Sequence, residues 1–230
     1  MIRYEKGAAP ANLTALTATP GIDWNSLGRG DREPLRAALV RDQGGLCAYC
    51  QRRVSRDDDP TTGWSQMKIE HWASRSAPGS RPLAWSNLLG VCTGNSRNAG
   101  DASAASPTVH HCDTSRGDRP LFLHPVEGSG PDPRTHLRYT KHGVVEPERA
   151  IASVQHDIDA LNMNAAPLCR ARKTIFDELW KRLARSQFAT GELRRMAKQH
   201  RVVAGTSVPE HAEFVRYHVL KKLRQRGETE

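Results

Sequence analysis

The segment LCAYCQ, residues 46–51, decides how this chain folds because it carries Cys47 and Cys50 three positions apart. Two thiolates at this spacing on a tight turn can bind one tetrahedral metal ion. Two more cysteines follow after long connections, and each would supply one further ligand. The sequence therefore predicts a structural zinc site whose ligands are Cys47, Cys50, Cys92 and Cys112.

The cysteine pattern leaves alternatives open. His110 and His111 stand directly before the fourth cysteine, so either histidine could replace a cysteine as a ligand. A redox pair of the thioredoxin type should open a helix after a buried strand, whereas LCAYCQ follows Gly44-Gly45 and precedes two arginines. Cys169 stands alone in a segment with helical periodicity, and we expect it to pack in the core.

Charge divides the chain of 230 residues into two parts. The whole sequence holds 34 Lys and Arg against 25 Asp and Glu, a net charge of +9. Residues 168–226 hold 15 basic and 5 acidic residues, whereas residues 1–167 hold 19 and 18. A cationic surplus of this size favours a polyanionic partner, most simply nucleic acid. It does not distinguish an enzyme from a passive binding protein.

A membrane protein is not expected from this composition. The sequence has no run of about 18 apolar residues, and its first residues, MIRYEKGAAPANL, lack the apolar stretch of a signal peptide. The sequence therefore predicts a soluble, cytoplasmic protein with no membrane partner. Its length is sufficient to bury one large hydrophobic core or two small ones.

The first half of the sequence predicts a mixture of helices and short strands. Residues 1–30 show no sustained periodicity and predict an irregular N-terminal arm. Asp31 is expected to cap a helix that Gly44-Gly45 ends. Strands are expected at 53–54 and, because the residues alternate in character, at 67–72.

Three connecting segments complete this half. The acidic stretch Asp57–Pro60 predicts a turn. The segment WSNLLGVC, residues 85–92, predicts a short helix in which Leu88 and Leu89 are buried. Residues 93–111 are rich in Gly, Ser, Asn and Ala, and they predict a long loop.

The second half predicts a hairpin and then helices only. Residues 137–140 and 144–146 flank Lys141-His142-Gly143, a sequence typical of a hairpin turn. Helices are expected over about 148–161, after Pro167, from Thr190, and over 208–226, where residues 207–210 fit a capping box. The overall fold class is therefore α+β.

Residues of the types that bind metal ions and catalyse phosphodiester hydrolysis lie between and directly after the predicted zinc ligands. Glu70-His71 and Asn87 lie between the second and third of these cysteines, and Asp113 directly follows the fourth. In this order, CAYC, IEHW, WSNLLGVC and HHCDTSRG resemble the HNH nuclease motif. With PLFLHP and ALNMN they resemble, more narrowly, the PtuB family, the HNH proteins of Septu and retron anti-phage systems. The resemblance covers about residues 35–175.

This resemblance implies a fold and a set of roles. It implies a zinc-stabilised ββα-metal nuclease domain at 31–147, followed by a basic helical region at 148–230. Glu70 and Asp113 would hold a catalytic Mg²⁺ or Mn²⁺, hard ions that prefer oxygen ligands. Asn87 would hold the loop and orient His71. Arg116, three residues after Asp113, would contact phosphate.

The chemistry of His71 fits independently of the resemblance. Phosphodiester hydrolysis needs a base that activates water and a cation that offsets charge on the phosphorane and the leaving oxygen. A histidine can take that proton near neutral pH. Two positions depart from the usual HNH pattern, in which the last letter is His or Asn and the first metal ligand is Asp or His. Here they are Asp113 and Glu70.

Basic residues of the second half are expected to contact phosphates without choosing a sequence. They recur on one broad helical face: Arg170, Arg172, Lys173, Lys181, Arg182 and Arg185. No P-loop occurs in the sequence. Resemblance to the PtuB family implies an ABC-type ATPase partner, PtuA, and an anti-phage role.

The sequence therefore predicts a metal-dependent HNH endonuclease acting on DNA or RNA. Two alternatives come from other classes. One is a zinc-stabilised module that binds nucleic acid or serves as an adaptor without catalysis. The other is a redox- or zinc-dependent regulator, which would leave Glu70, His71 and Asn87 unexplained.

Overall fold

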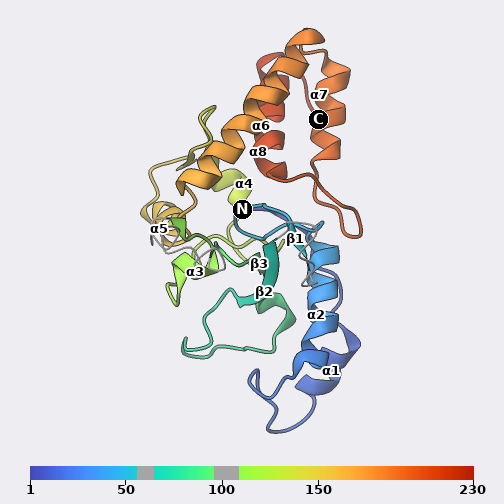
Figure 1. The fold of residues 1–230 in the computed structure, drawn as a ribbon, viewed down its shortest axis with the longest axis vertical. Coiled ribbons are helices and arrows are strands. Elements are labelled where there is room, and N and C mark those ends of the chain that lie inside the picture. The colour runs from blue at the N-terminus through green and yellow to red at the C-terminus, as the bar shows by residue number, and fades with distance from the viewer. Residues whose placement is uncertain (56–64, 96–108) are drawn as a thin grey trace.

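The structure is a computed structural model that describes residues 1–55, 65–95 and 109–230. The predicted acidic turn at 57–60 and residues 96–108 of the predicted loop lie outside the described residues. Within the described part of the chain, no helix is both long and apolar enough to cross a membrane. Helices and strands are combined in one α+β structure (Figure 1).

A three-stranded sheet in the order β1-β2-β3 lies at the centre of the fold. Its strands are β1 (Val54–Ser55), β2 (Ser65–His71) and β3 (Leu88–Cys92). β2 and β3 are antiparallel, with a register from Met67 opposite Cys92 to His71 opposite Leu88. The short helix α3 (Asp113–Arg116) lies beside this pair (Figure 1). Strands were expected at 53–54 and 67–72, and both are present within one or two residues.

The segment at 85–92 is a correction to the predicted short helix. Only Trp85–Asn87 form a turn of 3₁₀ helix, η1, and Leu88–Cys92 form β3. All five residues of β3 are buried, so its side chains give no alternation to reveal a strand. A short apolar run can be a buried strand or a buried helix, and periodicity alone cannot decide. The burial of Leu88 and Leu89 is confirmed.

Helix α2 (Arg29–Asp42) is the helix expected before the cysteine pair. Its N-cap is Gly28, and Asp31 lies three residues inside the helix, where its carboxylate accepts the Gly28 N–H at 2.9 Å. Asp31 therefore stabilises the start of the helix without being its cap. Gly44 and Gly45 end the helix with φ of +63° and +74°, conformations that favour glycine.

The first 30 residues are a second correction, because they are not an irregular arm. Residues 11–17 form helix α1 (Ala11–Thr17), and Met1, Ile2 and Tyr4 are buried. The Ile2 N–H donates to Ala48 O at 3.1 Å, which fastens this segment to the cysteine turn. A short amphipathic helix and an extended segment buried on all sides leave little periodicity to read in a sequence.

The predicted hairpin is present as β4 (Leu137–Tyr139) and β5 (Val145–Pro147), an antiparallel pair. A short helix, α4 (Pro133–His136), leads into it, with Asp132 as N-cap accepting the Arg134 N–H at 2.8 Å. Tyr139 and Val145 lie opposite each other and are buried.

Residues 148–230 are all described and contain the helices α5 (Ala152–Ala160), α6 (Ala166–Arg185), α7 (Thr190–Gln199) and α8 (Ala212–Gln225). The expected start of the last helix is wrong by four residues. α8 follows His211, which has a left-handed conformation, and Glu210 instead accepts the Arg53 N–H at 2.6 Å. One hydrophobic cluster contains Ile2, Val91 and Val219, so the predicted domain boundaries cross a shared core. The division into domains stays a prediction.

Two described segments, 93–95 and 109–112, are hydrogen-bonded to each other. Asn95 Nδ2 donates to Val109 O at 3.1 Å, and the His111 N–H donates to Gly94 O at 3.3 Å. Gly94 has φ of +59°, and a Cβ there would lie 2.1 Å from His111 O. Only glycine permits this close approach of the two backbones.

The substitution Gly94→Ala should therefore lower the free energy of unfolding by at least about 2 kcal/mol, from backbone strain and a clash with the carbonyl. Gly191→Ala in α7 is the matched control, because a Cβ there has no neighbour within 4 Å. It should raise stability by about 0.5 kcal/mol. Urea denaturation of both variants checks the pair; equal stability of Gly94→Ala and wild type would contradict the described backbone contact.

Candidate active site and cysteine cluster

Four cysteine side chains that are far apart in the sequence meet in the structure. The Sγ atoms of Cys47, Cys50, Cys92 and Cys112 all lie within 4.8 Å of one another, and all four residues are buried. Cys47 Sγ lies 3.8 Å from Cys112 Sγ, and Cys50 Sγ lies 3.6 Å from Cys92 Sγ. Four buried thiols at these separations form a cluster that could bind zinc in the tetrahedral Cys₄ manner.

Backbone hydrogen bonds place each cysteine. The turn that holds Cys47 is closed by its N–H donating to Arg52 O at 2.9 Å, and the Ala48 N–H donates to Gly90 O of β3 at 3.0 Å. Cys92 ends β3. Cys112 has φ of +58°, and its N–H donates to Leu161 O at 2.8 Å. The cluster therefore connects the turn after α2, the end of β3 and the start of α3.

The thiols influence one another and a histidine. Burial alone would raise the pKa of Cys50, but hydrogen bonds from the neighbouring thiols and His111 lower that pKa well below its usual value. Burial raises the pKa of the Cys112 thiol. A cluster that favours a thiolate at Cys50 and raises the pKa of Cys112 is suited to a cation that would ionise its thiols.

The histidine beside the cluster is His111. It is fully buried, and its Nδ1 lies 3.1 Å from Cys112 Sγ and 3.8 Å from Cys92 Sγ. This position allows an N–H to sulfur hydrogen bond, which orients metal-binding thiolates in many sites. His110 is partly exposed, and its backbone oxygen accepts from Asn162 Nδ2 at 2.7 Å.

The redox alternative is not favoured by the local structure. Residues 47–50 form a turn and open no helix, unlike a thioredoxin-type pair. Cys169 lies apart from the cluster and is partly exposed, with its Sγ 3.4 Å from Asn164 O.

A cavity of about 430 Å³ opens beside the cluster-bearing elements. It is lined from β2 by Ile69, Glu70 and His71, from α3 by Asp113, and from the surrounding loops by Trp24, Ser74, Arg75, Ser76, Gly117 and Asp118. Three of the four residues predicted to be catalytic therefore share one cavity: Glu70, His71 and Asp113.

His71 lies at the end of β2 and is held by two contacts. Its Nε2 lies 3.0 Å from Pro82 O, and the Trp24 ring meets its ring edge-on with centroids 4.5 Å apart. A carbonyl oxygen only accepts, so Nε2 carries the proton and Nδ1 carries the lone pair. Burial lowers the pKa of His71 to about 4, so the ring is neutral at pH 7 and its Nδ1 is unprotonated.

Trp24 was missed by reasoning from the sequence. It comes from the segment expected to be irregular, and it packs in a small cluster with Leu13, Leu35 and Leu88. A tryptophan that lies in no helical or strand pattern gives no signal that it will contact a histidine 47 positions later. Its role as a support for His71 is visible only in the fold.

Glu70 and Asp113 form a close pair of carboxylates. Burial, then a hydrogen bond and the charge of Asp113, raise the pKa of Glu70 to about 8. Lys68 Nζ lies 3.3 Å from Asp113 Oδ2. Two carboxyl groups that cannot easily ionise together fit a divalent cation, because the cation would relieve their repulsion. The donor set is all oxygen, which suits Mg²⁺ or Mn²⁺.

Asn87 is not among the residues that line the cavity, and it holds the loop that follows His71. Its Oδ1 accepts the Ala73 N–H at 2.7 Å, and its Nδ2 donates to Ala73 O at 3.1 Å. Its backbone oxygen accepts the Trp72 N–H at 2.9 Å. These three bonds fix the backbone on the C-terminal side of His71, and none of them reaches the cavity.

Arg116 is a correction, because the structure gives no room for its predicted phosphate contact. The residue is 1% exposed and forms an ion pair with Glu70. Its guanidinium also donates to His71 O at 3.1 Å, to Trp72 O at 2.6 Å and to Arg119 O at 2.7 Å. Arg116 therefore compensates the buried charge of Glu70 and fixes the end of β2. Among the described residues that line the cavity, the exposed cation is Arg75.

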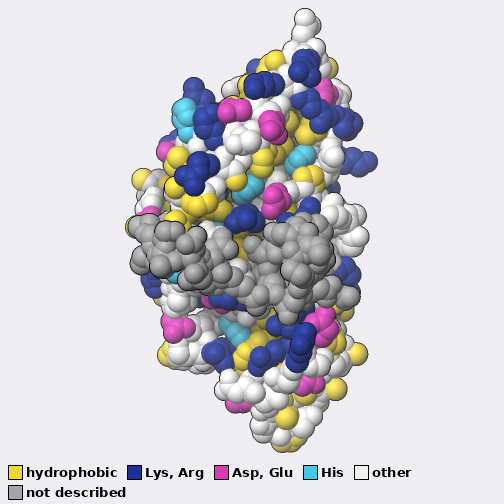
Figure 2. All heavy atoms as spheres, viewed as in Figure 1, with side chains coloured by type: hydrophobic (Ala, Val, Ile, Leu, Met, Phe, Trp, Pro, Cys, Tyr) yellow, Lys and Arg dark blue, Asp and Glu magenta, His cyan; other side chains and the backbone are white. Residues whose placement is uncertain are grey.

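The predicted phosphate-binding residues of α6 lie at the surface, with one exception. Arg170, Lys173 and Lys181 are exposed, and Lys173 forms an ion pair with Asp177. Arg172 is buried and donates to Gly143 O and Met163 O, both at 2.6 Å, so it does not belong to that face. Figure 2 shows Lys and Arg side chains over the part of the molecule where Figure 1 places α6, α7 and α8.

Comparison with known proteins gives a similarity to two HNH proteins. No family model matches the chain. It is 40% identical over 73 residues, 29% of this chain, to the "Retron Ec83 putative HNH endonuclease" of Escherichia coli. It is 24% identical over 159 residues, 66% of this chain, to the "Retron Vc95 putative HNH endonuclease" of Vibrio cholerae serotype O1 biovar El Tor. These matches span 25% and 67% of the relatives' own lengths, and they support an HNH nuclease family.

The cluster makes a prediction about metal content. Cys47→Ser should remove one of four thiolate ligands, so the purified protein should lose most of its zinc and unfold at a lower temperature. Cys169→Ser is the control, because Cys169 lies outside the cluster. Elemental analysis and thermal unfolding check both variants. Retention of one zinc per chain by Cys47→Ser, with unchanged unfolding, would refute the assignment of the ligand.

Arg116 makes a prediction about stability. Arg116→Ala leaves the buried Glu70 carboxyl and three backbone oxygens without their donor, so it should lower the free energy of unfolding by about 3 kcal/mol or more. Arg75→Ala, at the exposed arginine of the same cavity, should change it by less than about 0.5 kcal/mol. Chemical denaturation compares the two; a small decrease for Arg116→Ala would contradict the buried ion pair.

Proposed function

We propose that this chain is a metal-dependent HNH endonuclease that hydrolyses phosphodiester bonds in DNA or RNA. The observation that supports this most is the single cavity that brings Glu70, His71 and Asp113 together from β2 and α3. A neutral, oriented histidine and a pair of close carboxylates are the groups that such a hydrolysis needs. The similarity to two retron-associated HNH proteins points to the same reaction.

His71 is the general base in this proposal. Its Nδ1 lone pair takes a proton from a water molecule as the water oxygen attacks phosphorus, and the bond from phosphorus to the leaving sugar oxygen breaks. The Pro82 carbonyl holds the Nε2 proton, so the tautomer is fixed before substrate arrives. Trp24 restricts the ring to this orientation.

Glu70 and Asp113 are the residues that would hold Mg²⁺ or Mn²⁺. Such an ion offsets the negative charge that builds up on the phosphate and the leaving oxygen. Lys68 forms an ion pair with Asp113 and Arg116 forms one with Glu70, and both cations balance part of the carboxylate charge. Arg75 is placed at the rim, where a guanidinium can hold a phosphate of the substrate.

The zinc cluster has a structural role in this proposal. Cys92 ends β3 and Cys112 precedes Asp113 directly, so a zinc ion bound by the four thiolates would fix the distance between β2 and α3. Asn87 would fix the loop on the C-terminal side of His71 by accepting the Ala73 N–H. The exposed residues Arg170, Lys173 and Lys181 would add affinity for the nucleic-acid backbone.

The wider role proposed is that of a nuclease effector in anti-phage defence. The names of both relatives associate them with retrons, and the motif order resembles the PtuB proteins of Septu systems. An ABC-type ATPase partner like PtuA, in the same cytoplasmic compartment, would supply the energy-dependent control. An ATPase gene beside this one would support that part of the proposal.

The catalytic role of His71 has a direct test. His71→Ala should reduce cleavage of a plasmid or a structured RNA in Mg²⁺ or Mn²⁺ by at least about 100-fold, because the general base is removed. His142→Ala is the control, since His142 is exposed in the β4–β5 turn. Gel assays on both substrates measure the rates, with circular dichroism to verify folding. If Cys47→Ser abolishes biological activity while His71→Ala and Asp113→Ala remain fully active, a non-catalytic adaptor is favoured instead.

A further inference from the structure

A second and larger hollow lies away from the candidate active site. Its volume is about 1010 Å³, and it is formed by α4, the β4–β5 hairpin, α6 and α8. It shares no lining residue with the cavity that contains His71. We call it the α6–α8 groove. Figure 2 shows hydrophobic side chains between Lys and Arg side chains over the part of the molecule where Figure 1 places α6 and α8.

The floor of the α6–α8 groove is aromatic. Phe176 and Trp180 of α6 are stacked, with centroids 4.5 Å apart and an interplanar angle of 19°. Tyr217 and His218 of α8 meet edge-on at 5.3 Å. Phe176, Trp180 and Tyr217 are partly exposed, so their rings are accessible from the groove. His218 is 7% exposed, and its buried Nε2 has no hydrogen-bond partner among the described residues.

Three cations at the rim of the groove are exposed and have no carboxylate partner in the described parts of the chain: Lys141, Lys221 and Arg224. Tyr217, Lys221 and Arg224 are spaced four and three residues apart, which puts an aromatic ring and two cations on one face of α8. Lys221 Nζ lies 5.9 Å from the centre of the Tyr217 ring.

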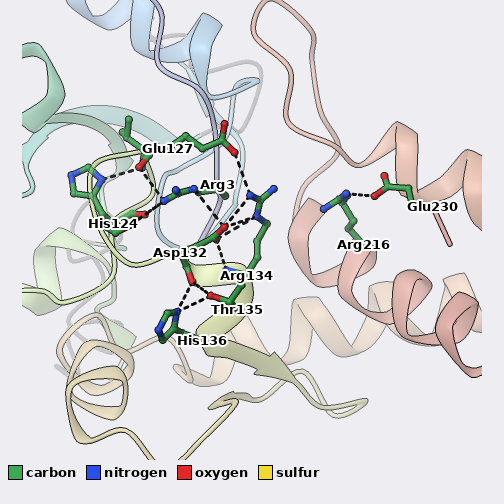
Figure 3. Close-up of polar contacts among 11 residues, drawn as sticks. Arg3, His124, Glu127, Asp132, Arg134, Thr135, His136, Arg216 and Glu230 are labelled. Atoms are coloured by element: carbon green, nitrogen blue, oxygen red, sulfur yellow. Dashed lines mark hydrogen bonds and ion pairs between the residues drawn. The ribbon is translucent and has the colours of Figure 1, made fainter.

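Other arginines of the groove are already paired. Figure 3 shows Arg134 on α4 held by Glu127 and Asp132, and Arg216 on α8 held by Glu230. Arg138 pairs with Glu146 across the hairpin. These ion pairs hold in place the side chains that form the walls of the α6–α8 groove. The lining residues outside these pairs are four cations, Lys141, Lys221, Lys222 and Arg224, and two carboxylates, Glu148 and Glu213, so the remaining charge of the groove is positive on balance.

We propose that the α6–α8 groove binds single-stranded nucleic acid, with bases stacked on its aromatic side chains and phosphates on Lys141, Lys221 and Arg224. Partly exposed aromatic rings bordered by cations are the two elements of single-strand binding without sequence choice. An acidic protein segment would use the cations but not the stacked rings, so the observations favour a nucleic acid. The inference deepens the proposed function by locating where a strand is held, and it rests on that function only for the class of ligand.

The test compares two sets of charge reversals with equal change in net charge. The groove variant is Lys141→Glu with Lys221→Glu and Arg224→Glu. The control is Arg149→Glu with Lys198→Glu and Arg201→Glu, three exposed residues outside the groove. Fluorescence anisotropy with a labelled oligothymidylate, in buffer without added Mg²⁺ or Mn²⁺, measures binding without cleavage.

The groove variant should bind at least tenfold more weakly than the control. A plot of the logarithm of the binding constant against the logarithm of the salt concentration should have a slope that is shallower by about 2. Each phosphate that the three cations no longer neutralise accounts for about 0.7 of this change. Tyr217→Ala should weaken binding by about tenfold, whereas Tyr217→Phe, which keeps the ring, should bind like wild type. Thermal unfolding of each variant verifies the fold. Equal affinities of groove variant and control, or tight binding by folded Tyr217→Ala, would overturn the proposal.

Three further outcomes are informative, and the last two separate this inference from the proposed function. If poly-glutamate competes with the oligonucleotide as effectively as unlabelled oligothymidylate does, the groove is a site for acidic protein segments and the inference is wrong. If His71→Ala binds the oligonucleotide normally and wild type never cleaves, the groove stands and the nuclease proposal fails. If wild type cleaves but the groove variant binds normally, the nuclease proposal stands and the inference fails.

Discussion

The convergence of four buried thiols is the interaction on which the rest of this structure depends. The residues involved come from the turn after α2, the end of β3 and the residue before α3, three places separated by long stretches of chain. Thiols this close do not attract one another strongly, so a cation bound by all four would stabilise the cluster. Because Asp113 directly follows Cys112, the position of the cluster also determines where one carboxylate of the cavity lies.

Opposing electrostatic effects act on the carboxyl groups of the cavity. Two carboxyl groups approach each other, and burial raises the pKa of Glu70 to about 8. Ion pairs of Arg116 with Glu70 and of Lys68 with Asp113 offset part of the repulsion between the two carboxyl groups. An uncompensated buried carboxylate would be costly, so the arginine that looked like a phosphate ligand is used inside the protein. The cationic surplus of the second half then remains available for a polyanion.

Sequence reasoning succeeded where spacing and local chemistry carry the information. The cysteine pair and the strand that carries His71 can both be read from neighbouring residues. It failed where three-dimensional packing decides. β3 was expected to be a helix because a fully buried strand shows no alternation. Trp24 and Arg116 were misjudged because their partners, His71 and Glu70, lie 47 and 46 positions away.

In the proposed function, one tightly held ion would stabilise the fold while a second, exchangeable ion would take part in the reaction. The most direct measurement is cleavage of nucleic acid by wild-type protein during treatment with excess EDTA, with zinc content followed in the same samples. Activity should stop while about one zinc per chain remains in the folded protein, and Mg²⁺ or Mn²⁺ should restore it, because hard oxygen ligands exchange their ion faster than buried thiolates do. Cleavage that continues unchanged in excess chelator would contradict the account.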